Sequence, residues 1–200
     1  MNRRYNTAKL TYAALLTALA IILSYFPEIP LAFFAPWLKL DFSFTPLLLL
    51  GFSIGPAMAA LAVVVTNVVH ILGGSTSGVG ELANIIVGLA FVMPPALIYR
   101  KNRSWRAAIA GMLIGIVLMM GAGMLSNRFL LLPTYFGPEY AAKLEDMGLT
   151  VSGYLWGAIL PFNLIKGSVN ALLTQLLYKR LSDFLKKADK DIAVQSGNSI

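Results

Sequence analysis

Six apolar runs, separated by shorter stretches rich in polar residues, glycine or proline, extend along most of the chain. An α-helix rises 1.5 Å per residue, so about 20 apolar residues are needed to cross a bilayer. The runs therefore predict an all-α integral membrane protein, with six transmembrane helices in a single domain over residues 1–185. The predicted helices span residues 8–26, 44–54, 57–72, 81–99, 105–127 and 154–181.

The segments around these helices differ in kind. Gly55-Pro56 interrupts the second run early, which leaves the second helix short or tilted. Aromatic residues and prolines between Pro27 and Asp41 predict a loop capable of structure, whereas Gly73–Gly80 predicts a flexible one. A polar loop is expected over 128–152. Residues 186–200 have mixed charge and no packing face, so they predict a disordered cytoplasmic tail.

The basic residues are distributed unevenly between the two sides of this arrangement. Twelve of the 16 Lys and Arg residues fall in the N-terminal segment, the 100–106 loop and the residues after 178, all on one side. Lys and Arg are enriched in cytoplasmic loops, so both termini are expected in the cytoplasm and the chain in the plasma membrane. Because the basic residues are scattered between apolar runs, the net charge of +7 indicates lipid headgroups or a partner protein and not nucleic acid.

Composition limits the chemistry further. With 58% hydrophobic and 12% charged residues and a mean hydropathy of +0.72, no length remains for a sizeable soluble domain, so a ligand site must lie between helices. One His and no Cys leave no credible transition-metal site, and neither metal nor cofactor is expected. The glycine-rich loop lacks the Lys-Ser/Thr ending of a P-loop, and no nucleophile, base and orienting group are recognisable together.

Lys166 carries the most information, because it lies about twelve residues into the last predicted helix, near the middle of the membrane. An unpaired charge there costs about 2.5–3.5 kcal/mol, so the side chain is expected to face a cavity or a partner. Asn163, Lys166, Asn170 and Thr174 follow one stripe of this helix. Hydrogen bonding between helices explains Asn170 and Thr174, whereas ligand contact is the preferred role of Asn163 and Lys166.

Two further helices carry polar candidates. Glu81, Asn84 and Gly88 repeat the same spacing at the start of the fourth predicted helix. Glu81 in the first turn either complements the helix dipole or contacts a ligand, whereas Asn84 lies one turn deeper, where no dipole effect accounts for it. Asn127 ends the fifth helix, and either caps it or reaches inward.

Ala14 and Ala18 form a small-xxx-small pair on the first predicted helix. Small residues at this spacing let a second helix approach closely, although alanine is common in membrane helices. The pair predicts a packing surface, either within the bundle or toward another protein.

Three motifs resemble the substrate-binding S components of energy-coupling factor (ECF) transporters. LKLDFS at Leu38–Ser43, followed by Thr45-Pro46, is similar to the first loop of the riboflavin-specific members. STSGVGELAN at Ser75–Asn84 resembles their helix-four entrance, and PFNLIKG at Pro161–Gly167 their helix-six motif. The resemblance, over residues 8–182, implies a six-helix protein that captures a vitamin with high affinity. It implies delivery through a transmembrane coupling subunit and two ATPase subunits.

The resemblance also implies residue roles. Asn163, Lys166 and Asn127 correspond to residues that contact the flavin, and Ala14 and Ala18 to the motif that docks on the coupling subunit. The cargo implied is riboflavin, with FMN as a further possibility, bound as a transported ligand. The expected substrate-binding residues are Asn163, Lys166, Asn127, Asn84, Glu81, Thr76, Gly80, Asp41, Phe42 and Leu40, with Trp37 as a further candidate for the pocket wall.

Other functions remain alternatives at this point. An S component for another vitamin would show the same composition and periodicity. A self-sufficient secondary transporter is disfavoured because the chain has no paired halves with matching broken helices and no clear acidic relay. An intramembrane enzyme is disfavoured by the missing catalytic set.

Overall fold

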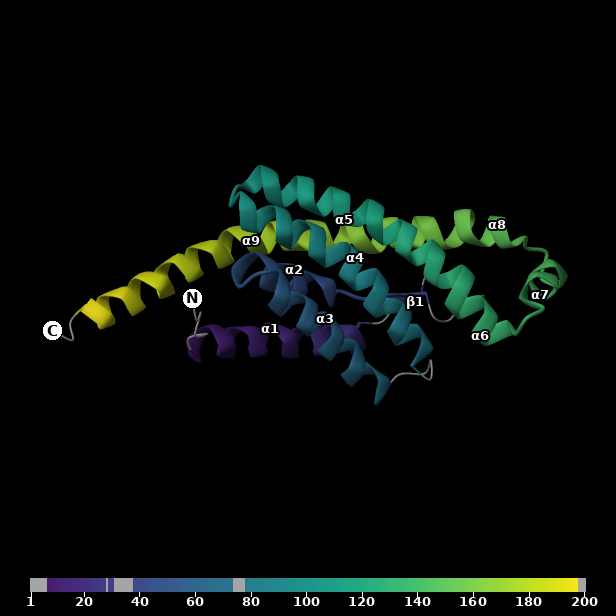
Figure 1. The fold of residues 1–200 in the computed structure, drawn as a ribbon, viewed down its shortest axis with the longest axis horizontal. Coiled ribbons are helices and arrows are strands. Elements are labelled where there is room, and N and C mark those ends of the chain that lie inside the picture. The colour runs from purple at the N-terminus through teal and green to yellow at the C-terminus, as the bar shows by residue number, and fades with distance from the viewer. Residues whose placement is uncertain (1–6, 28, 31–37, 74–77, 198–200) are drawn as a thin grey trace.

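The structure, a computed structural model, describes residues 7–27, 29–30, 38–73 and 78–197, with side chains of the last helix as far as Tyr178. It is an elongated bundle of helices with one short antiparallel strand pair (Figure 1). In chain order the elements are α1 (Thr7–Tyr25), β1 (Ile29–Pro30), β2 (Lys39–Leu40), α2 (Phe44–Ser53), α3 (Pro56–Ile71), α4 (Val79–Lys101), α5 (Trp105–Ser126), the π-helix η1 (Asn127–Leu131), α6 (Leu132–Phe136), α7 (Tyr140–Asp146), α8 (Val151–Tyr154), the π-helix η2 (Leu155–Ile159) and α9 (Leu160–Gly197).

The short helix α2 lies at the centre of the bundle. It contacts α1, α3, α4 and α9, and its residues 44–52 are all buried. Its sequence is almost entirely apolar, which is typical of a helix that is surrounded on every side. The main core forms around it, and includes Phe44, Leu47, Phe91 and Met119.

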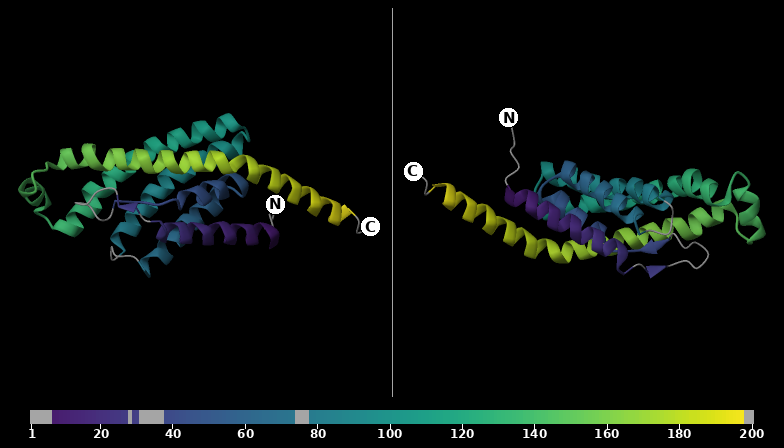
Figure 2. Two further views of the ribbon diagram at one scale, coloured as in Figure 1. Left: turned by 180° about the vertical axis from the view of Figure 1, so that it is seen from behind. Right: turned by 90° about the horizontal axis from the view of Figure 1, so that it is seen from below.

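A second, smaller core lies at one end of the molecule. Leu132, Leu144, Tyr154 and Ile159 pack there with Leu38, so that α6, α8, η2 and α7 form a compact cap. The two further views in Figure 2 show this cap at the end opposite to the start of α1. Leu38, directly before β2, thus packs in the cap.

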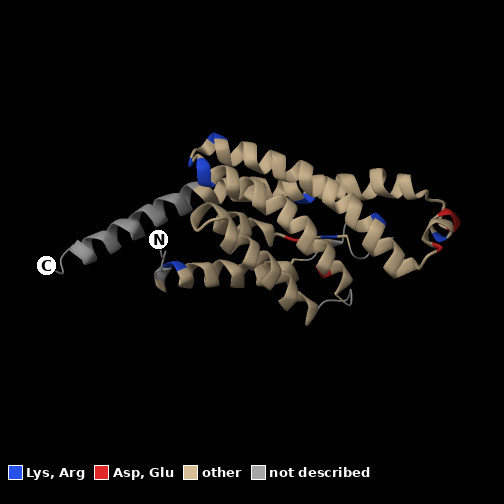
Figure 3. Cartoon of the chain, in the orientation of Figure 1, with Lys and Arg blue, Asp and Glu red and all other residues tan. Residues whose placement is uncertain are grey.

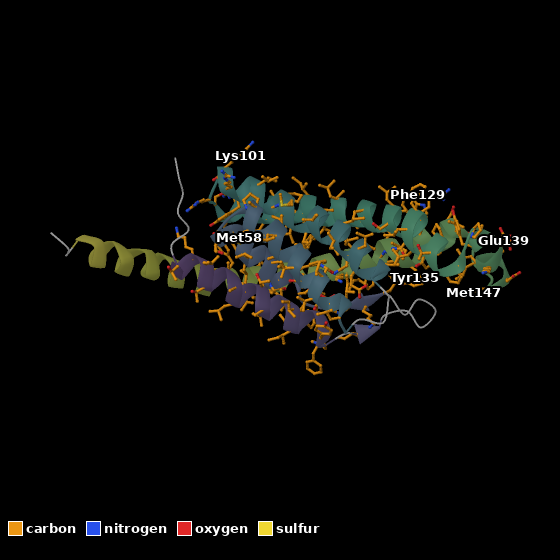
Figure 4. All side chains as sticks on the ribbon, turned by 60° about the horizontal axis from the view of Figure 1, so that its bottom comes forward. Met58, Lys101, Phe129, Tyr135, Glu139 and Met147 are labelled. Carbon is orange, nitrogen blue, oxygen red and sulfur yellow. The ribbon has the colours of Figure 1, made fainter. Side chains whose placement is uncertain are left out.

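The described charged residues gather mainly at the two ends of the bundle (Figure 3), while Asp41, Glu81 and Lys166 are buried inside it. Lys9 and the basic residues of the α4–α5 turn lie at one end, whereas Glu139, Glu145 and Asp146 lie in the cap. Figure 4 places Lys101 and Glu139 at these opposite ends. The distribution agrees with a membrane-embedded middle zone.

The described helices account for only part of the predicted crossings. By length and composition, Val79–Lys101 and Trp105–Phe136 are long and apolar enough to span a membrane. A third span results if Tyr140–Asp146 and Val151–Tyr178, bent by 80°, are counted together. The other apolar helices, Lys9–Tyr25, Phe44–Ser53 and Pro56–Ile71, are shorter.

Two predicted segments differ from the structure. The expected polar loop at 128–152 is mostly helical, because the apolar residues after Arg128 continue α5 through η1 into α6, and α7 follows. The expected disordered tail differs as well, since α9 continues to Gly197. Neither glycine nor proline occurs between Ser168 and Ser196 to end that helix.

Candidate ligand-binding site

A cavity of about 100 Å³ lies between β2, α3, α4, the end of α5 and the start of α9. Polar side chains from β2, α3, α4, η1 and α9 line it, among largely apolar walls that include Leu38, Val87, Leu131 and Phe162. Few polar groups in an apolar surround are typical of small-molecule sites. Seven of the ten predicted substrate-binding residues line it, namely Asp41, Gly80, Glu81, Asn84, Asn127, Asn163 and Lys166.

The ammonium group of Lys166 is the central cation of this cavity. Its Nζ donates to Asp41 Oδ2 at 2.7 Å and to Asn84 Oδ1 at 3.3 Å. The ring of Phe44 lies below it, with its centroid 4.9 Å from Nζ. Lys166 is 4% exposed and Asp41 7%, so the pair is shielded from solvent and the attraction between the charges is strong.

The Asp41 carboxylate is fixed by its own neighbourhood. Its Oδ1 accepts hydrogen bonds from the backbone nitrogen and hydroxyl of Ser43, at 2.9 and 2.5 Å. Asn170 Nδ2 donates to the Asp41 backbone oxygen at 3.0 Å, and Asn170 Oδ1 accepts from Thr45 Oγ1 at 2.9 Å. These bonds attach the end of β2 to α9. Asn170 therefore serves the packing of the bundle, as expected.

Two asparagines join α3 and α4 at the cavity wall. Asn84 Nδ2 donates to Asn67 Oδ1 at 2.7 Å, while Asn67 Nδ2 donates to the Val63 backbone oxygen at 2.8 Å. Because Asn84 Oδ1 also accepts from Lys166, α3 is connected to the cation on α9 through two amides. Sequence reasoning missed Asn67, although an asparagine inside an apolar helix was an available signal.

Glu81 lies at the entrance of α4, where Gly78, with φ of +87°, forms the turn that precedes the helix. Its carboxylate lies 3.1 Å from His70 Nδ1, and the His70 ring stacks on Tyr25 with centroids 4.5 Å apart. Tyr25 in turn donates to the Val69 backbone oxygen at 3.0 Å. This contact satisfies His70 near the end of α3, and His70 also lines the cavity.

Asn127 and Asn163 face the cavity from neighbouring helices. Asn127 Nδ2 donates to Gly123 O at 2.9 Å, and its Oδ1 accepts from Tyr154 at 2.9 Å. Asn163 Nδ2 donates to Ile159 O at 2.8 Å. A Cβ atom on Gly123 would lie 2.4 Å from Asn163 Nδ2, so only glycine leaves room for this amide. Asn127 is both a capping residue and an inward-facing one.

Two of the predicted residues that the structure describes, Leu40 and Phe42, do not line the cavity. Lys39 and Asp41 line it, whereas Leu40 between them does not, because successive side chains along an extended strand point to opposite faces. Phe42 is half-buried and does not line it either. Thr76, like Trp37, lies outside the described residues. Sequence reasoning also missed Ser24, Lys39 and Phe162, which the fold brings to the cavity from distant positions.

Comparison with known proteins identifies the family of this chain. The family model described as "ECF transporter, substrate-specific component" matches residues 8–178. The chain belongs to this family. As an S component it is a subunit of a membrane transporter and not an enzyme.

Relatives of this S component extend over nearly the same length. A protein named riboflavin transporter RibU from Staphylococcus aureus (strain TCH60) is 33% identical over 187 residues, which cover 94% of this chain and 96% of that protein. Riboflavin transporter FmnP from Bacillus subtilis (strain 168) is 30% identical, with 90% and 94% covered. A solved S component of a bacterial ECF transporter matches with a TM-score of 0.74 and 34% identity, covering 90% of this chain and 98% of that one.

The helix α1 of the S component presents two different faces. Ala13, Leu16 and Ala20 are buried against the bundle. Ala14 and Ala18, in contrast, are exposed. The small-residue pair therefore does not pack against the part of the chain that the structure describes.

Proposed function

We propose that this S component binds riboflavin with high affinity and releases it through a partner module. The observation that carries the proposal is the meeting of Asn127, Asn163 and Lys166 at one cavity, next to the apolar walls. The isoalloxazine ring of riboflavin is flat and largely apolar, with hydrogen-bonding groups along one edge. Amides, an ammonium group and aromatic or aliphatic walls are a suitable combination for such a molecule. The names of the relatives support this choice of cargo.

Cargo binding requires the cavity to widen. Its volume of about 100 Å³ is below the roughly 300–1,000 Å³ that is usual for sites of small-molecule ligands. The contacts that now close it include the Lys166–Asp41 and Asn84–Asn67 pairs. We propose that riboflavin exchanges these internal hydrogen bonds for bonds to itself, as β2 and Asp41 move away from α9.

Riboflavin fluorescence tests the cargo assignment directly. The protein is purified in detergent and titrated with riboflavin, FMN, thiamine and biotin, the last two as competitors. Saturable quenching by the protein, resistant to thiamine and biotin, is expected. Quenching that thiamine or biotin abolishes would assign the site to another vitamin. Uptake by liposomes that contain this chain alone would identify a self-sufficient transporter.

The proposal includes six membrane crossings, with both termini in the cytoplasm of the cell. It also includes docking of Ala14 and Ala18 on a coupling subunit that works with two ATPases. The absence of Cys makes the topology easy to test. A single cysteine at Glu145→Cys in the cap should react with an impermeant maleimide on intact cells. One at Arg103→Cys should react only after the membrane is opened. Reversed labelling would contradict the orientation.

A further inference from the structure

The hydroxyl group of Tyr154 acts on the cavity through another residue. Tyr154, at the end of α8, is 2% exposed and donates to Asn127 Oδ1 at 2.9 Å. Asn127 is among the described residues that line the cavity, and Tyr154 is not. The tyrosine therefore lies directly behind a predicted ligand contact.

Two hydrogen bonds determine how the Asn127 amide is oriented. An asparagine side chain has two donor hydrogens on nitrogen and one acceptor oxygen. Here one hydrogen is given to Gly123 O and the oxygen accepts from Tyr154. A flipped amide would set its oxygen against the Gly123 oxygen, two acceptors face to face. The second hydrogen on Nδ2 is then what Asn127 offers to a ligand.

The fold supports this contact from both sides. The wide turn η1 begins at Asn127, and the wide turn η2 begins directly after Tyr154. Single π-helical turns of this kind change the phase of a helix, and they occur often at functional sites. The Tyr154 ring is packed in the cap core with Leu132 and Leu144. Ring and hydroxyl are thus held independently, the ring by apolar contacts and the hydroxyl by the amide.

We propose that Tyr154 is a positioning residue, which orients the Asn127 amide so that its nitrogen donates to a carbonyl oxygen on the cargo. The site thereby favours a cargo with a hydrogen-bond acceptor at that position. The inference rests on the proposed binding of riboflavin, whose pyrimidine ring carries two such carbonyl oxygens. Without the hydroxyl, the amide oxygen loses its donor and the amide is free to turn. Asn127 then discriminates less between a strong and a weak hydrogen-bond acceptor on the cargo.

The test compares Tyr154→Phe with Tyr140→Phe. Tyr140 packs in the same cap core, and no contact of its hydroxyl with the cavity residues is described, so it is the matched control. Riboflavin and its two analogues with one ring carbonyl oxygen replaced by sulfur, a weaker acceptor, are titrated by fluorescence or absorbance. Tyr154→Phe should weaken riboflavin binding about two- to tenfold. It should also narrow the preference for riboflavin over one of the two thio analogues, an effect that a lower melting temperature alone does not produce. Tyr140→Phe should change neither quantity.

A double-mutant cycle with Asn127→Ala separates positioning from general loosening. Tyr154→Phe should have no further effect once Asn127 is alanine. An equal loss for riboflavin and both analogues, or a loss that persists in the Asn127→Ala background, would make Tyr154 structural and overturn the inference. If Tyr154→Phe does not fold, Tyr154→Met, with a flexible apolar side chain, gives the same comparison.

Failure of the proposed function would look different. Wild-type protein that does not bind riboflavin refutes the cargo assignment, whatever Tyr154 does. Riboflavin binding that Asn127→Ala weakens and Tyr154→Phe leaves unchanged refutes the positioning role alone.

Discussion

At the scale of single residues, the pairing of Lys166 with Asp41 is what makes a buried cation tolerable. The two groups neutralise each other at 2.7 Å, and Ser43 and Asn84 satisfy further hydrogen-bonding capacity. A buried ion pair adds little net stability, but removing one partner leaves an uncompensated charge. The pair thus keeps the cation buried in the cavity.

Asp41→Asn, which removes one charge, should therefore lower the stability of the protein more than removal of both charges does. We expect a cost of about 3–5 kcal/mol for the single variant, seen as a lower melting temperature of the cargo-free protein in detergent. The double variant Asp41→Asn with Lys166→Met should recover much of this loss. Glu145→Gln, which removes an exposed carboxylate, is the control and should change little. A double variant less stable than Asp41→Asn would contradict this explanation.

The stripe on α9 separates into two roles. Asn163 faces the cavity, whereas Asn170 bonds Thr45 and the Asp41 backbone. Asn163→Ala should weaken riboflavin binding about two- to tenfold with an unchanged melting temperature, because one ligand hydrogen bond is lost. Asn170→Ala should lower the melting temperature by leaving buried partners unsatisfied. Titration and thermal unfolding of both variants check this, and the opposite pattern would exchange the two roles.

Sequence reasoning found one half of this site more readily than the other. Lys166 and Asn163 stand out because polar residues in an apolar helix have a strong local signature. The pairing of Asp41 with Lys166 has none, since 125 residues separate them and the contact exists only through the fold. The contact of Tyr154 with Asn127 likewise has no local signature in the sequence, because only the packing of the fold brings the two residues together.

At the scale of elements, close approach of α4 and α5 depends on glycine. A Cβ atom at Gly111 would lie 2.5 Å from Pro95 Cα, and one at Gly115 would lie 2.5 Å from the Phe91 backbone oxygen. Small residues allow such backbone contact, which substitutes for a hydrophobic driving force in lipid. The α4 and α5 backbones are therefore in close contact, and both helices contribute residues to the cavity lining.

Gly115→Ala should push α5 away from α4 and destabilise the protein by about 1–3 kcal/mol, since the Phe91 backbone that the new Cβ atom meets cannot give way. Gly121→Ala on the same helix meets nothing within 4 Å and should be neutral or stabilising by up to about 1 kcal/mol, through helix propensity. Gly115→Ala should therefore lower the melting temperature, and Gly121→Ala should leave it unchanged or raise it. Equal shifts would mean that contact with Phe91 does not limit the approach.

Element types were predicted better than element boundaries. Apolar runs indicate helices, and Gly55-Pro56 does mark the break between α2 and α3. The continuation of α5 through η1 into α6 was not predicted, because Arg128 resembles a helix end and a single wide turn leaves no periodic signal of its own. The sequence could not separate Leu40 from Lys39 and Asp41, which line the cavity, because the predicted loop gave no strand alternation.

At the scale of the whole molecule, α1 connects an exposed small-residue face with the cargo site. One face of the helix is buried in the bundle, and the other presents Ala14 and Ala18 beside Leu15, which is 65% exposed. The end of α1 contributes Tyr25, which stacks on His70 at the cavity. A partner that binds α1 would therefore contact the element next to the cargo without touching the cavity itself.

Ala14→Leu or Ala18→Leu should impair ATP-dependent riboflavin uptake while leaving cargo affinity nearly unchanged. A partner helix packed against these alanines cannot accept a larger side chain without moving away, and neither alanine lines the cavity. Ala110→Leu, at an exposed alanine of α5, is the matched control and should leave uptake intact. The measurements are riboflavin titration of the isolated variants and uptake by vesicles that contain the assembled transporter. Normal uptake in both α1 variants would exclude this face as the docking surface, and lost cargo binding would show that it supports the bundle instead.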